Sequence, residues 1–321
     1  MERLSAIPNL TLTQNSRLAL HTRFGIGGPA AVFCSTSDQG AFASALELAK
    51  QLDLPSVVLG GGSNLVVADA GFEGIVLQFT GSRIEQQGNV LTAEAGALLQ
   101  DVVDTSIERG LEGMQTMTGI PGNLGGAVYG NAGAYGHSLQ EIVEQVSFTD
   151  GQTVREFSNE ECRFTYRESI FKQRKERVIL SADLRFRKGD PAALKKTADE
   201  IRAIRDAKYP PTMKCAGSIF KNVFLAELPV AVQAQVPTAL VRDGKIPSAW
   251  FLEQTGAKGM RKGDIQVAPY HANLIYNDGA GTATDLVFVI DELKRRVRDQ
   301  FGFDLQEEVQ YVGFNGTGKQ V

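Results

Sequence analysis

One segment restricts the possible folds of this chain more than any other. Residues 118–136 read T-G-I-P-G-N-L-G-G-A-V-Y-G-N-A-G-A-Y-G, and a second glycine cluster, G-G-G-S-N, occupies residues 60–64. Glycine adopts positive φ freely and lets the backbone approach a ligand with no Cβ in between. Successive backbone N–H groups in such loops form concave anion sites that suit a pyrophosphate. One diphosphate ligand shared by both clusters would explain them together, whereas either cluster alone is more simply explained by tight turns.

Two common nucleotide-binding patterns are not supported. The stretch G-I-G-G-P-A at 25–30 matches the dinucleotide pattern G-x-G-x-x-A. That pattern belongs between a strand and the helix it opens, and here Pro29 leads into a predicted strand. No G-x-x-x-x-G-K-S/T occurs in the chain. We therefore predict neither a classical Rossmann site nor a P-loop.

Length and composition favour an ordinary globular protein of two or three domains. The chain has 321 residues, of which 43% are apolar and 22% charged, so it can bury a sizeable core. A net charge of −4 gives no general basic surface, so we expect no nucleic-acid partner. The first residues lack the pattern of a secretory signal, and no segment resembles a membrane span. We expect a cytoplasmic protein with no membrane contact.

Cysteine and histidine give no anchor for a metal site, a redox pair or a hydrolase triad. There are three of each, and no two cysteines have the CxxC spacing. They are Cys34, Cys162, Cys215, His21, His137 and His271. We interpret the cysteines as small buried side chains and expect no metal.

The first 80 residues have the pattern of a compact α/β segment. Strands are predicted at 31–36, 56–59, 65–68 and 74–79, with an amphipathic helix at 38–52 that Ser37 would cap. From Ser82 the pattern changes to short strands, a helix at 98–109 closed by Gly110, and a hairpin at Asp150-Gly151. A strand at 178–187 precedes a helix that begins at Pro191 and ends before Pro210.

The remaining third has its own cycle of helices and strands. We predict a helix near 248–256, a strand at 272–276, an amphipathic helix at 284–301 and a final strand at 307–313. Residues 223–247 form a semi-apolar connection without a clear period.

The order of several motifs along the chain is specific. F-G-I-G-G, G-G-G-S-N, G-I-P-G-N-L-G-G-A, N-A-G-A-Y-G, C-R-F-T-Y-R-E-S-I-F, A-G-S-I-F-K-N, Q-T-G-A-K-G and E-E-V-Q-Y-V-G follow one another. In this order they resemble the UDP-N-acetylenolpyruvoylglucosamine reductases, the flavoenzyme family called MurB. The resemblance runs from about Thr22 to Gly313 and fits the shorter subgroup that lacks an extra tyrosine-bearing loop.

The resemblance implies an α+β fold: a two-subdomain FAD-binding module of the vanillyl-alcohol-oxidase type and a third, α/β substrate-binding domain. We expect the FAD-binding subdomains at 1–80 and 81–209 and the substrate-binding domain at 210–303, with the C-terminal strand, 304–321, returning to the second subdomain. Both glycine clusters would then contact a tightly, non-covalently bound FAD. The residues implied are Gly60, Gly61, Gly62, Ser63, Asn64, Thr118, Gly119, Ile120, Pro121, Gly122, Gly125, Gly126, Asn131, Ala132 and Gly133.

The family reaction implies three catalytic residues. NADPH reduces FAD, and the flavin N5 delivers hydride to the enolpyruvyl methylene of UDP-N-acetylglucosamine enolpyruvate, giving UDP-N-acetylmuramate for peptidoglycan synthesis. Negative charge then develops on the adjacent carbon and the carboxylate. Arg167 would pair with that carboxylate, Ser218 would protonate the carbon, and Glu308 would act beside the anion while carrying a proton. We expect neighbouring Glu307 to be a solvated carboxylate of an edge strand.

The substrate contacts are less specific. Tyr166 could pack on the substrate or in the core, and Lys208, Asn222 and Lys258 are candidates for the UDP diphosphate. No separate NADPH motif is visible, so we expect NADPH and the UDP-sugar to use one pocket alternately. No obligate protein partner is implied. Two alternatives stay open: another FAD-dependent oxidoreductase of this fold, and a non-catalytic flavin- or nucleotide-binding sensor.

Overall fold

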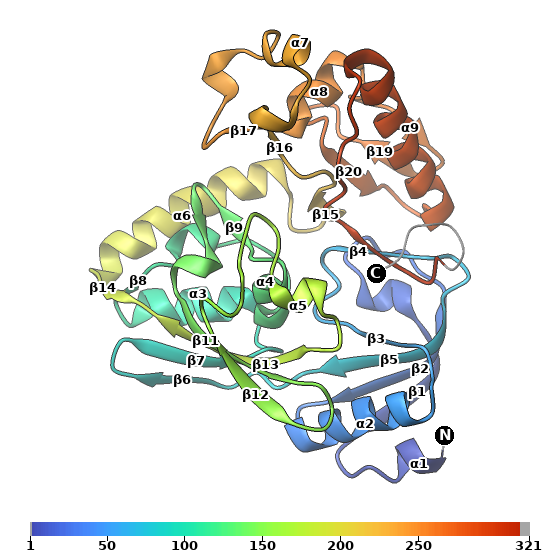
Figure 1. The fold of residues 1–321 in the computed structure, drawn as a ribbon, viewed down its shortest axis with the longest axis vertical. Helices are drawn as coiled ribbons and strands as arrows, with labels where there is room; N and C mark the ends of the chain where they lie inside the picture. Colours follow the sequence, from blue (N-terminus) through green and yellow to red (C-terminus); the bar gives the residue numbers. More distant parts are fainter. Residues whose placement is uncertain (1, 315–321) are drawn as a thin grey trace. The chain divides into compact units, whose positions relative to one another are not determined.

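The computed structural model describes residues 2–314 and forms two compact units, each of which mixes helices and strands (Figure 1). The first unit comprises the residues up to Ser16, Ala30–Gly62 and Glu73–Pro211. The second unit comprises Arg17–Pro29, Ser63–Phe72 and the residues from Thr212 onward. Each unit is therefore built from segments that are far apart in the sequence.

A four-stranded sheet with the order β1-β2-β5-β3 forms the N-terminal part of the first unit. Its strands and neighbouring helices are β1 (Thr11–Arg17), β2 (Pro29–Thr36), β3 (Ser56–Val58), β5 (Phe72–Phe79), α1 (Glu2–Ser5) and α2 (Gln39–Gln51). Because β2 begins at Pro29, the stretch G-I-G-G-P-A leads into a strand, as predicted. Helix α2 buries Phe42, whose ring centroid lies 5.6 Å from that of Phe79.

The helix predicted at 38–52 is confirmed, but its predicted N-cap is wrong. Asp38, not Ser37, caps α2, and its carboxylate accepts the N–H of Ala41 at 2.7 Å. The carboxylate satisfies an N–H that has no partner within the helix and also lies at the positive end of the helix dipole. Ser37 and Asp38 are both residue types that can cap a helix, and the sequence alone does not show which of them caps α2.

An antiparallel five-stranded sheet with the order β12-β11-β13-β7-β6 forms the other part of the first unit. Its strands are β6 (Ile84–Gln87), β7 (Val90–Glu94), β11 (Val143–Thr149), β12 (Val154–Ser158) and β13 (Val178–Arg185). The predicted hairpin is confirmed: β11 and β12 pair across a turn in which Asp150 Oδ1 accepts the N–H groups of Gln152 and Thr153. Short strands lie beside this sheet: β8 (Leu111–Glu112), β9 (Gly133–Ala134), β10 (His137–Ser138) and β14 (Arg187–Lys188).

The helices of this part close a core that both sheets share. They are α3 (Leu99–Glu108), α4 (Leu124–Tyr129), α5 (Ile170–Gln173) and α6 (Pro191–Lys208), with 3₁₀ turns η2 (Gln115–Met117) and η3 (Leu139–Glu141). The buried cluster includes Leu77, Leu99, Leu124 and Leu184. Residues of both predicted FAD-binding subdomains, 1–80 and 81–209, therefore contribute to one hydrophobic core.

The second unit contains a four-stranded sheet with the order β15-β20-β19-β18. Its strands are β15 (Lys214–Ser218), β18 (Arg261–Lys262), β19 (Ile265–Val267) and β20 (Leu274–Asn277), and its helices are α8 (Ser248–Gln254) and α9 (Ala283–Phe301). The segment at 223–247 folds as β16 (Val223–Phe224), η4 (Leu225–Glu227), α7 (Val230–Gln233), η5 (Thr238–Leu240) and β17 (Lys245–Ile246), with β16 and β17 paired. η1 (Leu18–His21) also belongs to this unit.

The C-terminal strand pairs differently from the prediction. β21 (Gln310–Val312) runs parallel to β4 (Leu65–Val67), which lies within 1–80 and not within 81–209. Gln310 N donates to Asn64 O, and Ala68 N donates to Val312 O, both at 2.9 Å. This pairing buries Val66, Val67 and Val312, which explains why the strand joins β4. Residues 315–321 of the predicted segment lie outside the described residues.

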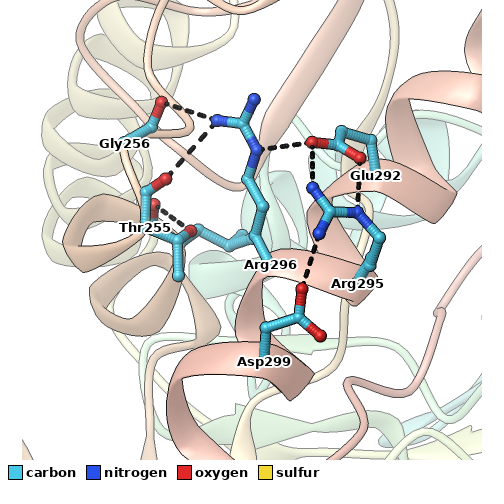
Figure 2. A network of polar contacts seen from close by, with 7 residues as sticks. Thr255, Gly256, Glu292, Arg295, Arg296 and Asp299 are labelled. Atoms are coloured by element: carbon cyan, nitrogen blue, oxygen red, sulfur yellow. Dashed lines mark hydrogen bonds and ion pairs between the residues drawn. The ribbon is translucent and has the colours of Figure 1, made fainter.

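Helix α9 is tied to the end of α8 by a charged network (Figure 2). Glu292 accepts from both Arg295 and Arg296 at 2.8 Å, which holds the pKa of that carboxyl well down, at about 2. Arg296 in turn reaches the carbonyl groups of Thr255 and Gly256, both at 3.5 Å. A cation at these last carbonyls complements the negative end of α8.

Across residues 2–314, none of the helices has the combination of length and apolar character that a bilayer span requires.

Candidate active site

The two glycine clusters adjoin within the first unit. A Cβ built on Gly61 would lie only 2.5 Å from Asn123 Oδ1 and 2.9 Å from Gly122 Cα. No side chain fits between the loop after β3 and the loop before α4, so glycine is required at 61. By contrast, a Cβ on Gly60 or Gly126 would meet nothing within 4 Å. The two clusters thus contact each other at Gly61 and leave open space beside Gly60 and Gly126.

The second cluster is fixed on its other side by the segment before α3. Leu99 N donates to Gly122 O at 3.0 Å, and Leu124 N donates to Ala97 O at 2.9 Å. The Asn123 side chain adds a bond from Nδ2 to Gly96 O at 2.7 Å. The first cluster is held by Gln78, whose Nε2 donates to Gly60 O at 3.0 Å. Both loops therefore have a fixed backbone, as an anion cradle requires.

Residues Thr118–Pro121 begin the second cluster. Gly119 has a φ of +72° and donates its N–H to Gln100 Oε1 at 2.7 Å. The hydroxyl of buried Thr118 lies 3.3 Å from Gln100 Nε2, and Ile120 packs against the core. Gln100, on α3, thus shapes this part of the cradle. The sequence offered no signal for this role, because a glutamine in the first turn of a helix is common.

Asn131–Gly133 contact a different part of the chain. Asn131 is 2% exposed and has a φ of +42°. Its Nδ2 donates to Thr165 O at 2.8 Å and to Gln140 Oε1 at 3.1 Å, while its Oδ1 accepts from Gln140 N at 3.1 Å. Gly133 O accepts from Arg167 Nη2 at 3.0 Å. Both polar atoms of the Asn131 side chain are thus bonded within the first unit.

Arg167 lies in a tight turn that an isolated bridge between Thr165 and Glu168 closes. Thr165 and Glu168 exchange two backbone hydrogen bonds, at 3.1 and 3.2 Å, so Tyr166 and Arg167 occupy the tip. Arg167 has a φ of +60°, a conformation that a non-glycine residue adopts at a cost. Its guanidinium carbon lies 5.2 Å from the centre of the Tyr166 ring. The turn thus presents an aromatic ring and a cation together.

Ser218 and Glu308 come together in the second unit. Ser218 ends β15 and pairs with Leu274 of β20. The next residue, Ile219, accepts the N–H of Glu308 at 2.7 Å, and Lys221 N donates to Gln306 O at 2.9 Å. The chain from Ser218 to Lys221 therefore lies directly beside the chain from Gln306 to Glu308. Two residues that are 90 positions apart in the sequence become neighbours on adjacent backbone segments.

Asn64, the last residue of the first glycine cluster, bonds the chain segment that contains Glu308. Asn64 Nδ2 donates to Glu308 O at 2.9 Å, and Asn64 O accepts from Gln310 N at 2.9 Å. Ser63 and Asn64 belong to the second unit, together with Glu308. The end of the predicted cofactor loop is thus bonded directly to the backbone of a predicted catalytic residue.

Asn273, a buried residue that the sequence did not indicate, bonds the segment after Ser218 on the side opposite Glu308. Asn273 is 3% exposed. Its Oδ1 accepts from Phe220 N and its Nδ2 donates to Phe220 O, both at 2.9 Å. Its backbone carbonyl accepts from Ile219 N at 3.2 Å. The segment after Ser218 is therefore fixed on both edges.

Glu307 is not the solvated carboxylate that the sequence suggested. Its side chain is 12% exposed, and it accepts from Lys294 Nζ at 2.7 Å and from the Tyr311 hydroxyl. Burial, with the Glu307 charge beside it, raises the pKa of Tyr311, so that hydroxyl keeps its proton.

Of the three diphosphate candidates, Lys208 belongs to the first unit, and Asn222 and Lys258 belong to the second. Lys208 ends α6, and its Nζ lies 5.2 Å from the centre of the Tyr209 ring. Lys258 pairs with Glu253 at 3.0 Å, and Asn222 is exposed just before β16. Their role stays a prediction. Among residues 2–314, no three His, Cys, Asp or Glu side chains gather in a way that could hold a metal ion.

Comparisons with known proteins cover nearly the whole chain. Residues 29–155 match the family model of an FAD binding domain, and residues 209–312 match the model described as UDP-N-acetylenolpyruvoylglucosamine reductase, C-terminal domain. The UDP-N-acetylenolpyruvoylglucosamine reductase of Solibacter usitatus is 54% identical over 311 residues, which cover 97% of this chain and 100% of that protein. The corresponding protein of Rubrobacter xylanophilus is 36% identical and covers 92% of this chain.

A solved structure agrees with these matches. The crystal structure of UDP-N-acetylenolpyruvylglucosamine reductase from Thermus caldophilus superposes with a TM-score of 0.72 at 27% identity, and the match covers 94% of this chain and 98% of that one. The predicted fold, an FAD-binding module with a further C-terminal domain, is therefore confirmed.

Proposed function

This chain belongs to the family of UDP-N-acetylenolpyruvoylglucosamine reductases, and from that premise we propose how its residues carry out the reaction of an FAD-containing, NADPH-dependent oxidoreductase. The reaction reduces UDP-N-acetylglucosamine enolpyruvate to UDP-N-acetylmuramate, a precursor of peptidoglycan. In the overall reaction, the carbon–carbon double bond of the enolpyruvyl group gains a proton and a hydride, and NADPH is the source of the hydride. The observation that carries the proposal is the pairing of Glu308 N with Ile219 O, which brings Ser218 and Glu308 side by side.

The adjoining glycine loops fit a flavin dinucleotide. FAD, when bound, takes a hydride from NADPH and passes it to the enolpyruvyl methylene carbon. Gly60, Gly61, Gly122 and Gly126 would offer backbone amides and a surface without side chains, since the two clusters adjoin and leave open space beside Gly60 and Gly126. The fixed hydrogen bonds of Gly60 O and Gly122 O keep this cradle in place before the ligand arrives.

Three residues of this chain would act on the substrate. The Arg167 guanidinium would pair with the enolpyruvyl carboxylate, whose negative charge grows as hydride is added to the double bond. The Ser218 hydroxyl would donate a proton to the neighbouring carbon, and a relay from solvent would restore it. Glu308 would lie beside the developing anion, where a carboxyl that carries a proton would avoid the repulsion that a charged carboxylate would exert on the anion.

The remaining parts of the proposal concern binding and location. We place FAD on the segments 1–80 and 81–209 and the UDP-sugar on 210–303, with Tyr166, Lys208, Asn222 and Lys258 as substrate contacts. NADPH and the UDP-sugar would use one pocket in turn, since the sequence has no separate motif for NADPH. NADPH and UDP-sugars are cytoplasmic metabolites, which supports the cytoplasmic location predicted from the sequence.

An anaerobic absorbance experiment tests the proposal. The oxidised flavin band of the purified protein is recorded, bleached with NADPH, and then followed after addition of UDP-N-acetylglucosamine enolpyruvate. We expect the band to return with one UDP-N-acetylmuramate formed per flavin. Bleaching without substrate-dependent return would favour another FAD-dependent oxidoreductase, and a flavin that NADPH does not bleach would favour a sensor.

A matched pair of variants tests the serine role. Ser218→Ala should bleach normally with NADPH but return the oxidised band at least about 100-fold more slowly, since general acid catalysis contributes a factor of this size. Ser248→Ala is the control, because Ser248 is buried and bonds Lys221 O within the same unit. Normal reoxidation in Ser218→Ala would remove the serine from the mechanism.

A further inference from the structure

The loop at 131–133 bonds the arginine turn at two separate points. Asn131 Nδ2 donates to Thr165 O at 2.8 Å, at the base of the turn, and Gly133 O accepts from Arg167 Nη2 at 3.0 Å, at its tip. All these residues belong to the first unit. The glycine-rich segment that begins at the cofactor cradle therefore also supports the residue proposed to bind the substrate carboxylate.

The arginine turn needs such support because its backbone is strained. Arg167, at the tip, has a φ of +60°, and a non-glycine residue keeps a positive φ only where surrounding contacts hold it. Lys172 Nζ donates to Arg167 O at 2.9 Å and to Glu168 Oε1 at 3.0 Å, which fixes the far side of the turn. Asn131 Nδ2 fixes the near side through Thr165 O.

Asn131 itself is held firmly enough to serve as an anchor. It is 2% exposed, and Gln140 contacts it twice, through its backbone N–H and its side-chain Oε1. Asn131 has a φ of +42°, a left-handed conformation that asparagine tolerates better than most residues. A buried amide with every polar atom bonded is rigid, so the position of Thr165 O is well defined.

We propose that Asn131 is a positioning residue that holds the Tyr166–Arg167 turn in place for the substrate carboxylate, and that its side chain is not a ligand of the cofactor. The inference rests on the proposed function, because it assigns Arg167 the carboxylate. Asn131 would act through Arg167 alone. Its loss should therefore affect the transfer to the substrate, but neither FAD affinity nor reduction by NADPH.

Two substitutions of Asn131 separate this role from simple folding. Asn131→Asp keeps the size but replaces the donor to Thr165 O by a carboxylate oxygen, and Asn131→Gly removes the side chain while still allowing a positive φ. Asn89→Asp is the matched control. Asn89 lies in the same unit and also donates its amide to a backbone carbonyl, that of Phe186 at 2.8 Å, but it bonds neither Asn131 and Gln140 nor the turn at 165–168.

Stopped-flow absorbance measures the two halves of the reaction separately, and a fluorescence titration of the apoprotein gives the FAD Kd. For both Asn131 variants we expect flavin reoxidation by the substrate to slow by about 10- to 100-fold, the usual effect of a misplaced catalytic group. Bleaching by NADPH and the FAD Kd should stay within about threefold of wild type. Asn89→Asp should leave all three quantities unchanged.

A double-mutant cycle decides whether Asn131 acts through Arg167. In an Arg167→Ala background, Asn131→Gly should cause no further loss, because the group it positions is gone. A multiplicative loss in the double variant, a weakened FAD affinity, or unchanged reoxidation in both single variants would each overturn the inference. Failure of the wild-type protein to be reoxidised by the substrate would instead refute the proposed function.

Discussion

Gly60 and Gly61 are adjacent residues with different surroundings. A Cβ at 61 would overlap Asn123 Oδ1 and Gly122 Cα, whereas a Cβ at 60 would meet nothing within 4 Å. We expect Gly61→Ala to lower the free energy of unfolding of the apoprotein by about 1–3 kcal/mol, because the neighbouring loop must move. Gly60→Ala should leave that free energy nearly unchanged and raise the FAD Kd, because its methyl group would occupy the ligand's space.

Urea unfolding of the apoprotein and FAD titration together measure both effects. Gly40→Ala is the control, because it lies in the first turn of α2 with only Asp38 Oδ1 near its Cβ, at 3.3 Å. It should be neutral or slightly stabilising. Equal FAD affinity for Gly60→Ala and wild type would mean that the open side of Gly60 is not where the cofactor binds.

At the scale of residues, the sequence indicated that the two glycine clusters would share one ligand, and in the structure Gly61 lies against Gly122 and Asn123. The two glycine clusters can approach each other this closely because Gly61 has no Cβ, and this property can be read directly from the sequence. The prediction for Glu307 was wrong, because two consecutive glutamates look alike in the sequence and only the fold brings Lys294 and the Tyr311 hydroxyl against Glu307. The hydrogen bond from the Asn131 amide to Thr165 O could not be predicted from the sequence either, because the two residues are 34 positions apart.

At the scale of elements, the stability that the α8–α9 network contributes should decrease as the pH falls. The pKa of Glu292 is lowered to about 2 by hydrogen bonds from Arg295 and Arg296. A carboxyl whose folded pKa lies below its unfolded value, near 4.5, stabilises the fold above that value and loses this contribution as the pH falls toward 2. The pair is partly exposed, so we expect no more than about 1 kcal/mol.

Glu292→Gln tests this expectation through urea unfolding at several pH values. The variant should be less stable than wild type at pH 7, and the difference should vanish as the pH approaches 2. Asp199→Asn is the control, because Asp199 pairs with Lys195 on α6 and takes no part in the network of Figure 2. A difference between Glu292→Gln and wild type that is the same at pH 3 and pH 7 would contradict the electrostatic explanation.

The ends of the helices that the sequence predicted agree with the structure to within one or two residues, because these ends are marked locally, whereas the short helices α1, α4, α5 and α7 were not predicted. Asp190 caps α6 just before Pro191, and Gly302, with a φ of +73°, ends α9. Several strands were predicted correctly, but β1, β15 and β19 were not, and the strand partners were not predicted. β21 joins β4 across more than two hundred residues of sequence, and no local signal records a pairing at that distance.

At the scale of the whole molecule, the second unit is assembled from three separate stretches of chain. Residues 17–29 and 63–72 join the residues from Thr212 onward. The sequence placed a boundary near 210 but gave no sign of this interleaving, because composition and periodicity describe neighbours along the chain. The bonds that close the unit join distant segments: Asn277 Nδ2 donates to Phe24 O at 3.0 Å, and Asp69 accepts from Ala283 N at 2.8 Å.

This interleaving predicts that residues 212–321 alone cannot fold. Without 63–72, β21 loses its partner β4, and α9 loses the Asp69 carboxylate that accepts from Ala283 N and Thr284 N. Unsatisfied strand edges and helix ends are costly, so the isolated fragment should show no cooperative thermal transition by circular dichroism. A fusion that adds residues 17–29 and 63–72 through flexible glycine-serine linkers should restore one. A cooperative transition in the bare fragment would show that the β4–β21 pairing and the Asp69 cap are dispensable, and the second unit would then be an ordinary C-terminal domain.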